Sequence, residues 1–248
     1  MGTGKGKDEI PRSLELLWKT VERRPRGRRP ALSRDRIVAA AIAIADAEGL
    51  PALSMARLAE RLGCAPMSLY RHVANKDELQ VFMVDTAPGP PPVIEVAAHE
   101  WRRGLERWAR ELRAVYYRHP WILQLVAGRP PLEPGQLAWL DAGLRTLHAT
   151  RLDPGRRLSV ILLVVNYLRG EAQVATGLVQ SHQRTKRERR EMQAWYGRML
   201  ARLIDAKRFP ALAELSAAGV FGPGDGGEGT DFDFGLARIL DGIEAFRS

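Results

Sequence analysis

The sequence predicts an all-α fold, and three observations support this. Apolar residues recur at helical spacing along most of the chain, as Trp101, Leu105 and Trp108 do. No segment shows the apolar–polar alternation typical of a β-strand. The proline-rich segment APGPPPV, residues 87–93, ends helices and separates two helical parts. We therefore expect a basic extension at 1–31, a small helical domain at 32–86 and a larger helical domain at 93–248.

Composition favours a protein with a polyanionic partner. The chain has 248 residues, 45% of them hydrophobic, so it can bury a sizeable core. Its net charge of +9 and pI of about 10.2 suggest nucleic acid or an anionic membrane surface as the partner. Only 6 of the 38 basic residues are lysine. This excess of arginine favours phosphate and guanine recognition, but it also fits a GC-rich coding bias.

Three features of the chain predict a cytoplasmic protein. Cys64 is the one cysteine, so neither an intrachain disulfide nor a cysteine-based metal cluster is expected. The N-terminus MGTGKGKDEIPRS lacks the apolar stretch of a signal peptide. The longest apolar run, Val160–Val165, is far shorter than the roughly 20 residues that a membrane span needs.

The extension at 1–31 contains two kinds of segment. The sequence SLELLWKTVE places Leu14, Leu17 and Trp18 on one side of a short amphipathic helix. The sequence RRPRGRRP, residues 23–30, follows, and its prolines and glycine indicate extended backbone. This basic segment is either an arm that lies along a nucleic-acid groove or a solvated tether.

Helix boundaries in the domain at 32–86 are marked by characteristic residues. Side chains that can accept free backbone N–H groups stand where the first, second and fourth helices would begin: Ser33, Ser54 and Asn75. Gly49 and Gly63 can adopt the left-handed conformation that ends a helix, and Pro66 suits the first turn of the third helix. The second and third helices, joined by a sharp turn at Gly63, form a candidate helix-turn-helix.

The third helix of this domain is the expected DNA-recognition helix, because the second helix of such a motif enters the major groove. Leu69 and Val73 are one turn apart and face the core, which leaves the polar and flexible side chains outside. Arg can bind guanine in bidentate fashion, Ser can bond a base or a phosphate, and Met can contact a thymine methyl. The expected base contacts are Met67, Ser68 and Arg71, with Tyr70 and Lys76 on phosphates. The alternative is an ordinary surface helix of an all-α domain.

The domain at 93–248 is expected to consist of long helices. They are predicted at His99–His119, Gln136–Ala149, Pro154–Gln180, Thr185–Ile204 and Asp231–Phe246, with a loop at 222–229. The helix from Pro154 is apolar on all sides and is expected to be central. The last helix carries an apolar stripe made of Phe232, Leu236, Ile239, Leu240 and Ile243. These two helices either form a dimer interface or are only intrachain core.

The segments LSRDRIVAAAIAIADAEG and LSMARLAERLGCAPMSLYRHVANKDEL, which cover nearly all of residues 32–84, resemble the DNA-binding domain of TetR-family transcriptional repressors. HPWILQLVAGRP and PLEPGQLAWLDAGLRTLHATRLDP more loosely resemble the C-terminal domain of the tetracycline-repressor branch. The resemblance implies an all-α homodimer that binds a palindromic operator on double-stranded DNA. It also implies release of the DNA when a small molecule enters the C-terminal domain.

By position, the resemblance also implies a set of DNA contacts. They map to Ser54, Ala65, Pro66, Met67, Ser68, Tyr70, Arg71 and Lys76. Ala65 and Pro66 lack polar side chains, so base recognition would fall mainly on the three residues named above. The operator should therefore differ from the tetracycline operator.

The expected ligand site departs from that of the tetracycline repressor. Leu125 and Gly128 stand where that repressor has a His and a Thr, and Trp108 stands where it has an Asn. The groups that hold magnesium–tetracycline are therefore missing, and we expect an apolar or aromatic effector. The expected pocket residues are Trp101, Trp108, Leu112, Trp121, Leu125, Gly128, Trp139 and Asp141. For the tryptophans, ordinary core packing is the alternative.

No catalytic, metal or cofactor site is predicted. The histidines form no helical His pair beside a Glu, and no Ser-His-Asp or Cys-His set has local support. The main prediction is a dimeric DNA-binding repressor released by a small molecule. The alternatives are a regulator of the same fold controlled by a protein partner, a helical enzyme, and a peripheral membrane protein that uses the basic arm.

Overall fold

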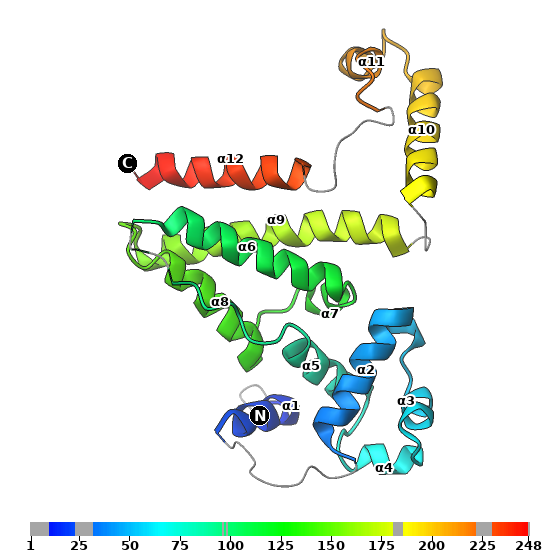
Figure 1. Cartoon of the computed structure of the whole chain (residues 1–248), viewed down its shortest axis with the longest axis vertical. Helices are drawn as coiled ribbons and strands as arrows, with labels where there is room; N and C mark the ends of the chain where they lie inside the picture. Colours follow the sequence, from blue (N-terminus) through cyan, green and yellow to red (C-terminus); the bar gives the residue numbers. More distant parts are fainter. Residues whose placement is uncertain are drawn as a thin grey trace, which may run out of the picture. The chain divides into compact units, whose positions relative to one another are not determined.

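The computed structural model describes residues 10–22, 32–95, 97, 99–180, 186–221 and 230–247, and every regular element in these ranges is helical (Figure 1). The helices are α1 (Arg12–Glu22), α2 (Arg34–Glu48), α3 (Met55–Leu62), α4 (Pro66–Tyr70), α5 (Lys76–Thr86), α6 (Trp101–Arg118), α7 (Ile122–Val126), α8 (Pro134–Thr146), α9 (Pro154–Gln180), α10 (Lys186–Leu203), α11 (Pro210–Ala217) and α12 (Thr230–Arg247), with a 3-10 turn, η1 (Leu50–Ala52). The predicted all-α fold is confirmed. The basic segment 23–30 and the predicted loop at 222–229 lie outside the described residues.

The chain forms two compact units. Residues 1–173 and 243–248 make the first, and residues 174–242 make the second. The first unit holds both the DNA-binding domain expected from the sequence and, after the proline-rich segment, α6, α7, α8 and most of α9. That segment, 87–93, joins α5 to α6 within this unit.

Side-chain caps start three of the helices in residues 32–86 as the sequence predicts. The hydroxyl groups of Ser33 and Ser54 accept backbone N–H groups three residues on, at 3.3 and 3.2 Å. The Asn75 side chain accepts the N–H of Glu78 at 2.8 Å. Helix α4 ends at Tyr70 rather than continuing to residue 73, because the chain must become extended at Asn75 to cap α5.

A small apolar core holds these short helices together. Ile37 and Ala41 of α2, Leu58 of α3 and Leu69 of α4 are fully buried. Phe82 of α5 is 1% exposed and closes the same core. A five-residue helix such as α4 is unstable alone, so this packing is what holds its outer face in place.

Helices α6, α8 and α9 form the core that follows. Trp108 of α6 is 1% exposed and donates its indole N–H to the carbonyl oxygen of Trp139 on α8 at 2.9 Å. Gly143 of α8 lies against the Trp108 ring, where an added Cβ would stand 2.8 Å from two ring atoms. The glycine is therefore needed for the close approach of α6 and α8.

Helix α9 is buried along one side only. Val160, Ile161 and Val164 are buried, whereas Leu158 and Leu162 are 41% and 46% exposed. One side of this predicted central helix is therefore exposed in a single chain. Its segment Pro154–Ala175 is long and apolar enough to span a membrane. The core helix of a soluble protein can have the same length and composition.

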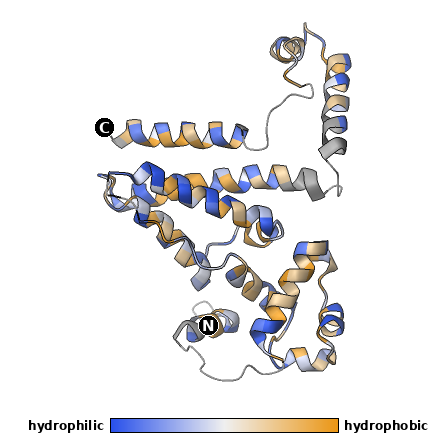
Figure 2. Ribbon diagram, viewed as in Figure 1, coloured by the Kyte–Doolittle hydropathy of each residue, from blue (hydrophilic) through white to orange (hydrophobic). Residues whose placement is uncertain are grey.

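Helix α12 alternates between apolar and polar residues along its length (Figure 2). Four members of its predicted stripe, Phe232, Leu236, Leu240 and Ile243, are buried, while Phe234 is 67% exposed. The second unit contains α10 and α11, with an edge-on contact between Tyr196 and Phe221. The short helices α7 and α11 were not predicted, because segments this short show too few turns for a periodic pattern.

Candidate DNA-contact surface and ligand cavity

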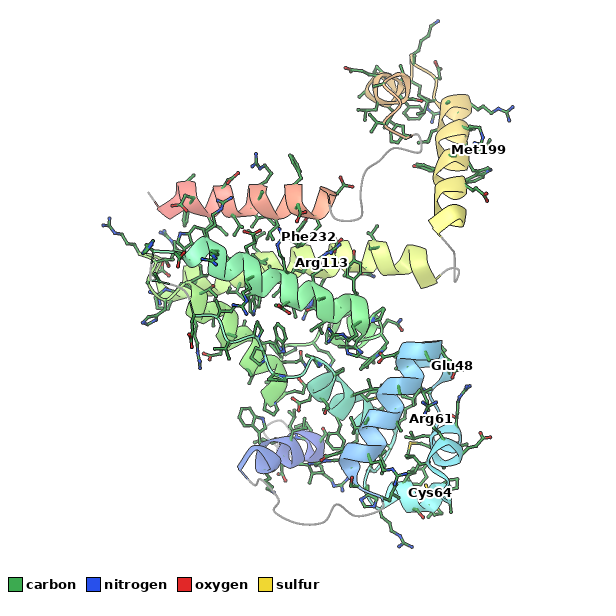
Figure 3. All side chains as sticks on the ribbon, viewed as in Figure 1. Glu48, Arg61, Cys64, Arg113, Met199 and Phe232 are labelled. Carbon is green, nitrogen blue, oxygen red and sulfur yellow. The ribbon has the colours of Figure 1, made fainter. Side chains whose placement is uncertain are left out.

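The turn between α3 and α4 depends on Gly63. Its φ of +65° is in the left-handed region, and its N–H bonds back to the Glu60 carbonyl oxygen at 3.1 Å. An added Cβ there would meet nothing within 4 Å, so the backbone conformation rather than space requires glycine. Cys64 follows in the same turn (Figure 3).

Helix α4 separates a buried side from an exposed side. Leu69 is fully buried, and so is Val73 just beyond the helix. Met67 is 72% exposed and Tyr70 44% exposed, and Arg71 is exposed as well. Ser68 is half-buried between them. The structure therefore places a methionine, a hydroxyl, a phenol and a guanidinium on one short, outward-facing surface.

The other expected DNA contacts border this surface. Ser54 is exposed at the N-terminus of α3, and its hydroxyl keeps a free O–H donor while it caps the helix. Ala65 and Pro66 are exposed at the start of α4. Lys76 is half-buried in the first turn of α5. We call these four together with Met67, Ser68, Tyr70 and Arg71 the DNA-contact surface.

Helix α1 docks on the DNA-binding domain through an ion pair that the sequence did not reveal. One guanidinium nitrogen of Arg12 lies 2.8 and 3.0 Å from the two carboxylate oxygens of Glu78 on α5. Glu78 is 7% exposed and also accepts the backbone N–H of Ala74. The pairing joins residues 66 positions apart, so no local pattern could indicate it. On the same helix, Trp18 donates to the carbonyl oxygen of Leu132 at 3.2 Å.

A cavity of about 460 Å³ lies between α6, α8 and α9, with α7 and the end of α5 at its wall. Most of its lining is apolar or aromatic: Val84, Pro88, Trp108, Leu112, Val115, Tyr116, Ile122, Val126, Trp139, Leu140, Leu158, Leu162 and Val165. The polar lining side chains are Arg129, Gln136, Asn166 and Arg169. Such a lining suits a molecule with a large apolar surface and few polar groups.

Three of the eight residues expected at the ligand site line this cavity: Trp108, Leu112 and Trp139. Leu125 lies in a small adjoining depression beside Arg129. The other four lie elsewhere. Trp101 and Trp121 are core side chains, Gly128 has a positive φ of 69° in the loop after α7, and Asp141 pairs with Arg145 on the surface of α8.

The indole N–H groups at the cavity are already satisfied. Trp108 donates to Trp139 as described, and Trp139 donates to the carbonyl oxygen of Gly89 at 2.9 Å. Both rings therefore act as fixed apolar walls. The Arg129 guanidinium lies 3.4 Å from the carboxylate of Glu133, which is 2% exposed and also accepts from Gln136 at 2.7 Å.

Helix α5 connects the cavity with the DNA-binding domain. Val84 in its last turn and Pro88 just beyond it line the cavity, while Lys76 in its first turn belongs to the DNA-contact surface. Between them, the Asp85 carboxylate accepts the backbone N–H of Gly135 on α8 at 2.6 Å. Burial raises the pKa of Asp85, and the bond from Gly135 acts in the opposite direction.

A second connection runs from α2 to the start of α7. A carboxylate oxygen of Asp46 lies 2.7 Å from Nδ1 of His119 and accepts the indole N–H of Trp121 at 2.7 Å. Ile122, which follows directly, lines the cavity. The contacts of Asp46 therefore join α2 to the segment that leads into the cavity wall.

A half-buried polar cluster joins α6 to α9. Arg113 donates to both carboxylate oxygens of Glu171, at 3.1 and 2.8 Å, and Tyr117 donates to the same carboxylate at 2.7 Å (Figure 3). Burial and the neighbouring carboxylate raise the pKa of Tyr117 to about 12. Every polar group in the cluster has a partner, which indicates a structural role. Among the described residues, no group of three His, Cys, Asp or Glu side chains is placed to hold a metal ion.

Comparison with known proteins places this chain in one family. Residues 37–80 match the model for bacterial regulatory proteins of the tetR family, and residues 96–247 match the model for the tetracyclin repressor-like C-terminal domain. The second match alone covers more than half of the chain. The chain therefore belongs to the TetR family, as its resemblance to that family predicted.

Two characterised relatives are informative. The HTH-type transcriptional repressor DrrR1 of Streptomyces coeruleorubidus is 40% identical over 243 residues, which are 96% of this chain and 87% of DrrR1. The TetR family protein ActR of Streptomyces coelicolor, in complex with actinorhodin, superposes with a TM-score of 0.72 at 28% identity, covering 89% of this chain and all of ActR. A complex of ActR with (S)-DNPA gives a TM-score of 0.70 at 27% identity, covering 88% of this chain and 99% of ActR.

Proposed function

We propose that this protein is a dimeric transcriptional repressor that leaves its operator when a small apolar or aromatic molecule fills the cavity between α6, α8 and α9. The observation that carries the proposal is that Val84 and Pro88, at the end of α5, form part of the cavity wall. A bound molecule would contact the helix whose first turn borders the DNA-contact surface. DrrR1 is named a repressor and ActR is seen with two small molecules, which supports both halves of the proposal.

Base recognition is assigned to Met67, Ser68 and Arg71, and phosphate contact to Ser54, Tyr70 and Lys76. The exposure of Met67 and Arg71 beside the buried Leu69 supports this assignment. Short, exposed side chains at Ala65 and Pro66 let the backbone approach the DNA closely. A single short helix makes few contacts, so two copies bound to two half-sites are needed for high affinity.

Helices α9 and α12 are the proposed dimerisation elements. Leu163 and Val174 of α9, which do not line the cavity, are 51% and 67% exposed in one chain. Phe234 and Phe246 of α12 are 67% and 59% exposed. Covering these side chains with the same surface of a second copy would remove them from water.

The experiment is fluorescence anisotropy of the protein on its own upstream intergenic DNA and on scrambled DNA, across a salt series. We expect Arg71→Ala to weaken specific binding by about 1–3 kcal/mol, because it removes a bidentate base contact. Arg145→Ala is the matched control, since Arg145 lies on α8 and pairs with Asp141. Equal binding of both DNAs by the wild-type protein would refute sequence-specific repression.

Control by a protein partner is the alternative mode of regulation. An open cavity of about 460 Å³ favours a small molecule instead, because a partner-controlled protein has no need of an unfilled interior. The same anisotropy assay separates the two. A small molecule that releases the DNA from the purified protein establishes the first mode.

A further inference from the structure

The wall of the cavity carries an unbalanced positive charge. Among the residues that the structure describes, the charged side chains that line it are Arg129 and Arg169, and none is acidic. Arg129 is paired with the buried carboxylate of Glu133. Within the described part of the chain, Arg169 has no acidic partner, and its one hydrogen bond is a long one, 3.5 Å from its Nε to the hydroxyl oxygen of Tyr116. The cavity therefore offers a guanidinium that no described carboxylate pairs with.

Three of the polar groups that line the cavity come from neighbouring positions on α6 and α9. Asn166 and Arg169 are three residues apart on α9 and share a face, and Tyr116 of α6 meets Arg169 there. In the described structure the Asn166 side chain makes no hydrogen bond. Asn166, Arg169 and Tyr116 therefore keep N–H or O–H groups that can donate hydrogen bonds to a ligand.

Another part of the cavity wall is aromatic and apolar. Trp108 and Ile161 both lie beside Gly143, so α6 and α9 approach each other there. From Trp108 to Tyr116, and from Ile161 to Arg169, the separation is eight residues in each helix, or about 12 Å. The two helices therefore run past the cavity in the same direction, from an apolar end to a cationic end.

We propose that the effector is an aromatic acid whose carboxylate or other planar anion is bound by Arg169 with Asn166 and Tyr116, while its fused rings lie against Trp108 and Trp139. The inference rests on the proposed function, because it specifies the molecule that fills the same cavity. Guanidinium matches a carboxylate with two parallel N–H donors. The surrounding apolar wall strengthens that attraction relative to water.

The test is isothermal titration calorimetry of the full chain with anthraquinone-2-carboxylic acid and with its methyl ester, which differ in charge but share their rings. We expect the wild-type protein to bind the acid about tenfold or more tightly than the ester. Arg169→Gln should abolish that preference and leave ester binding unchanged. Arg110→Gln is the matched control, since Arg110 lies on α6 outside the cavity lining and pairs with Glu106; it should keep the preference.

The outcomes separate the two proposals. If the wild-type protein binds both compounds equally, or if Arg169→Gln keeps the preference for the acid, the assignment of the anion site is overturned while the cavity stands as a ligand site. If neither compound binds a protein that still binds its operator, the aromatic effector fails as well. If Arg110→Gln also loses the preference for the acid, the preference comes from the overall charge of the protein. That result would equally overturn the role of Arg169.

Discussion

Replacement of Gly143 by alanine tests the packing that shapes the cavity. The new methyl group would stand 2.8 Å from two atoms of the Trp108 ring and 3.2 Å from Cδ1 of Ile161. Trp108 is 1% exposed and holds a buried hydrogen bond to Trp139, so its ring cannot move without loss. The substitution is therefore expected to displace the ring that forms the aromatic wall.

Two opposing effects set the magnitude. Alanine in place of glycine within a helix stabilises by about 1 kcal/mol through helix propensity. Overpacking a filled core costs about 1–3 kcal/mol, and loss of a buried hydrogen bond costs about 1–3 kcal/mol more. The clash is with a rigid ring, so the unfavourable effects dominate. We expect Gly143→Ala to lower the free energy of unfolding by about 1–5 kcal/mol.

Gly170→Ala is the matched control. Gly170 lies in α9, where an added Cβ would meet nothing within 4 Å. That substitution should stabilise by about 0.5–1 kcal/mol, so the two changes should have opposite signs. Urea unfolding followed by circular dichroism measures both. A Gly143→Ala protein as stable as Gly170→Ala would refute the close approach of α6 and α8.

Two further substitutions test the contacts that tie the DNA-binding domain to its neighbours. Arg12→Ala should destabilise by about 1 kcal/mol and speed hydrogen exchange in α1, because it leaves the carboxylate of Glu78 short of one partner while Arg12 itself is largely exposed. Lys19→Ala, which breaks an exposed pair with Glu15, should change stability by less than about 0.5 kcal/mol, and an equal effect of the two would contradict the docking role of Arg12. Asp85→Asn tests the raised pKa of that carboxyl: since the folded state holds the proton more tightly than the unfolded state, wild-type stability falls as pH rises from the usual value of 3.8 through the raised pKa. Unfolding titrations should therefore show that the stability of Asp85→Asn relative to wild type increases over that pH range. A stability difference that does not depend on pH would contradict the raised pKa of Asp85.

Much of the DNA-binding domain could be predicted from the sequence because its signals are local. Ser33, Ser54 and Asn75 cap helices through bonds that reach only three residues along the chain. Leu69 and Val73 recur at helical spacing, so their burial followed from the pattern alone. The residue types of the recognition helix and the resemblance to the TetR family could be read from the same segment, residues 32–84.

The ligand site was predicted less completely, because several tryptophans have the same apolar character but different neighbours. Trp108 and Trp139 line the cavity, whereas Trp121 is held in the core by a bond to Asp46, 75 positions earlier. Arg169 was not predicted at all. It is one of many arginines in a basic chain, and only its position in the cavity distinguishes it.

The sequence by itself determined the helices, their caps, the outward-facing residues of α4 and the family, since each depends on residues within a few positions of one another. Only the tertiary structure decided that Arg12 pairs with Glu78, that the absence of a Cβ at Gly143 leaves room for the Trp108 ring, and which side chains line the cavity. The first two of these contacts join residues 66 and 35 positions apart. Their free energy depends on distances that no linear pattern of residue types records.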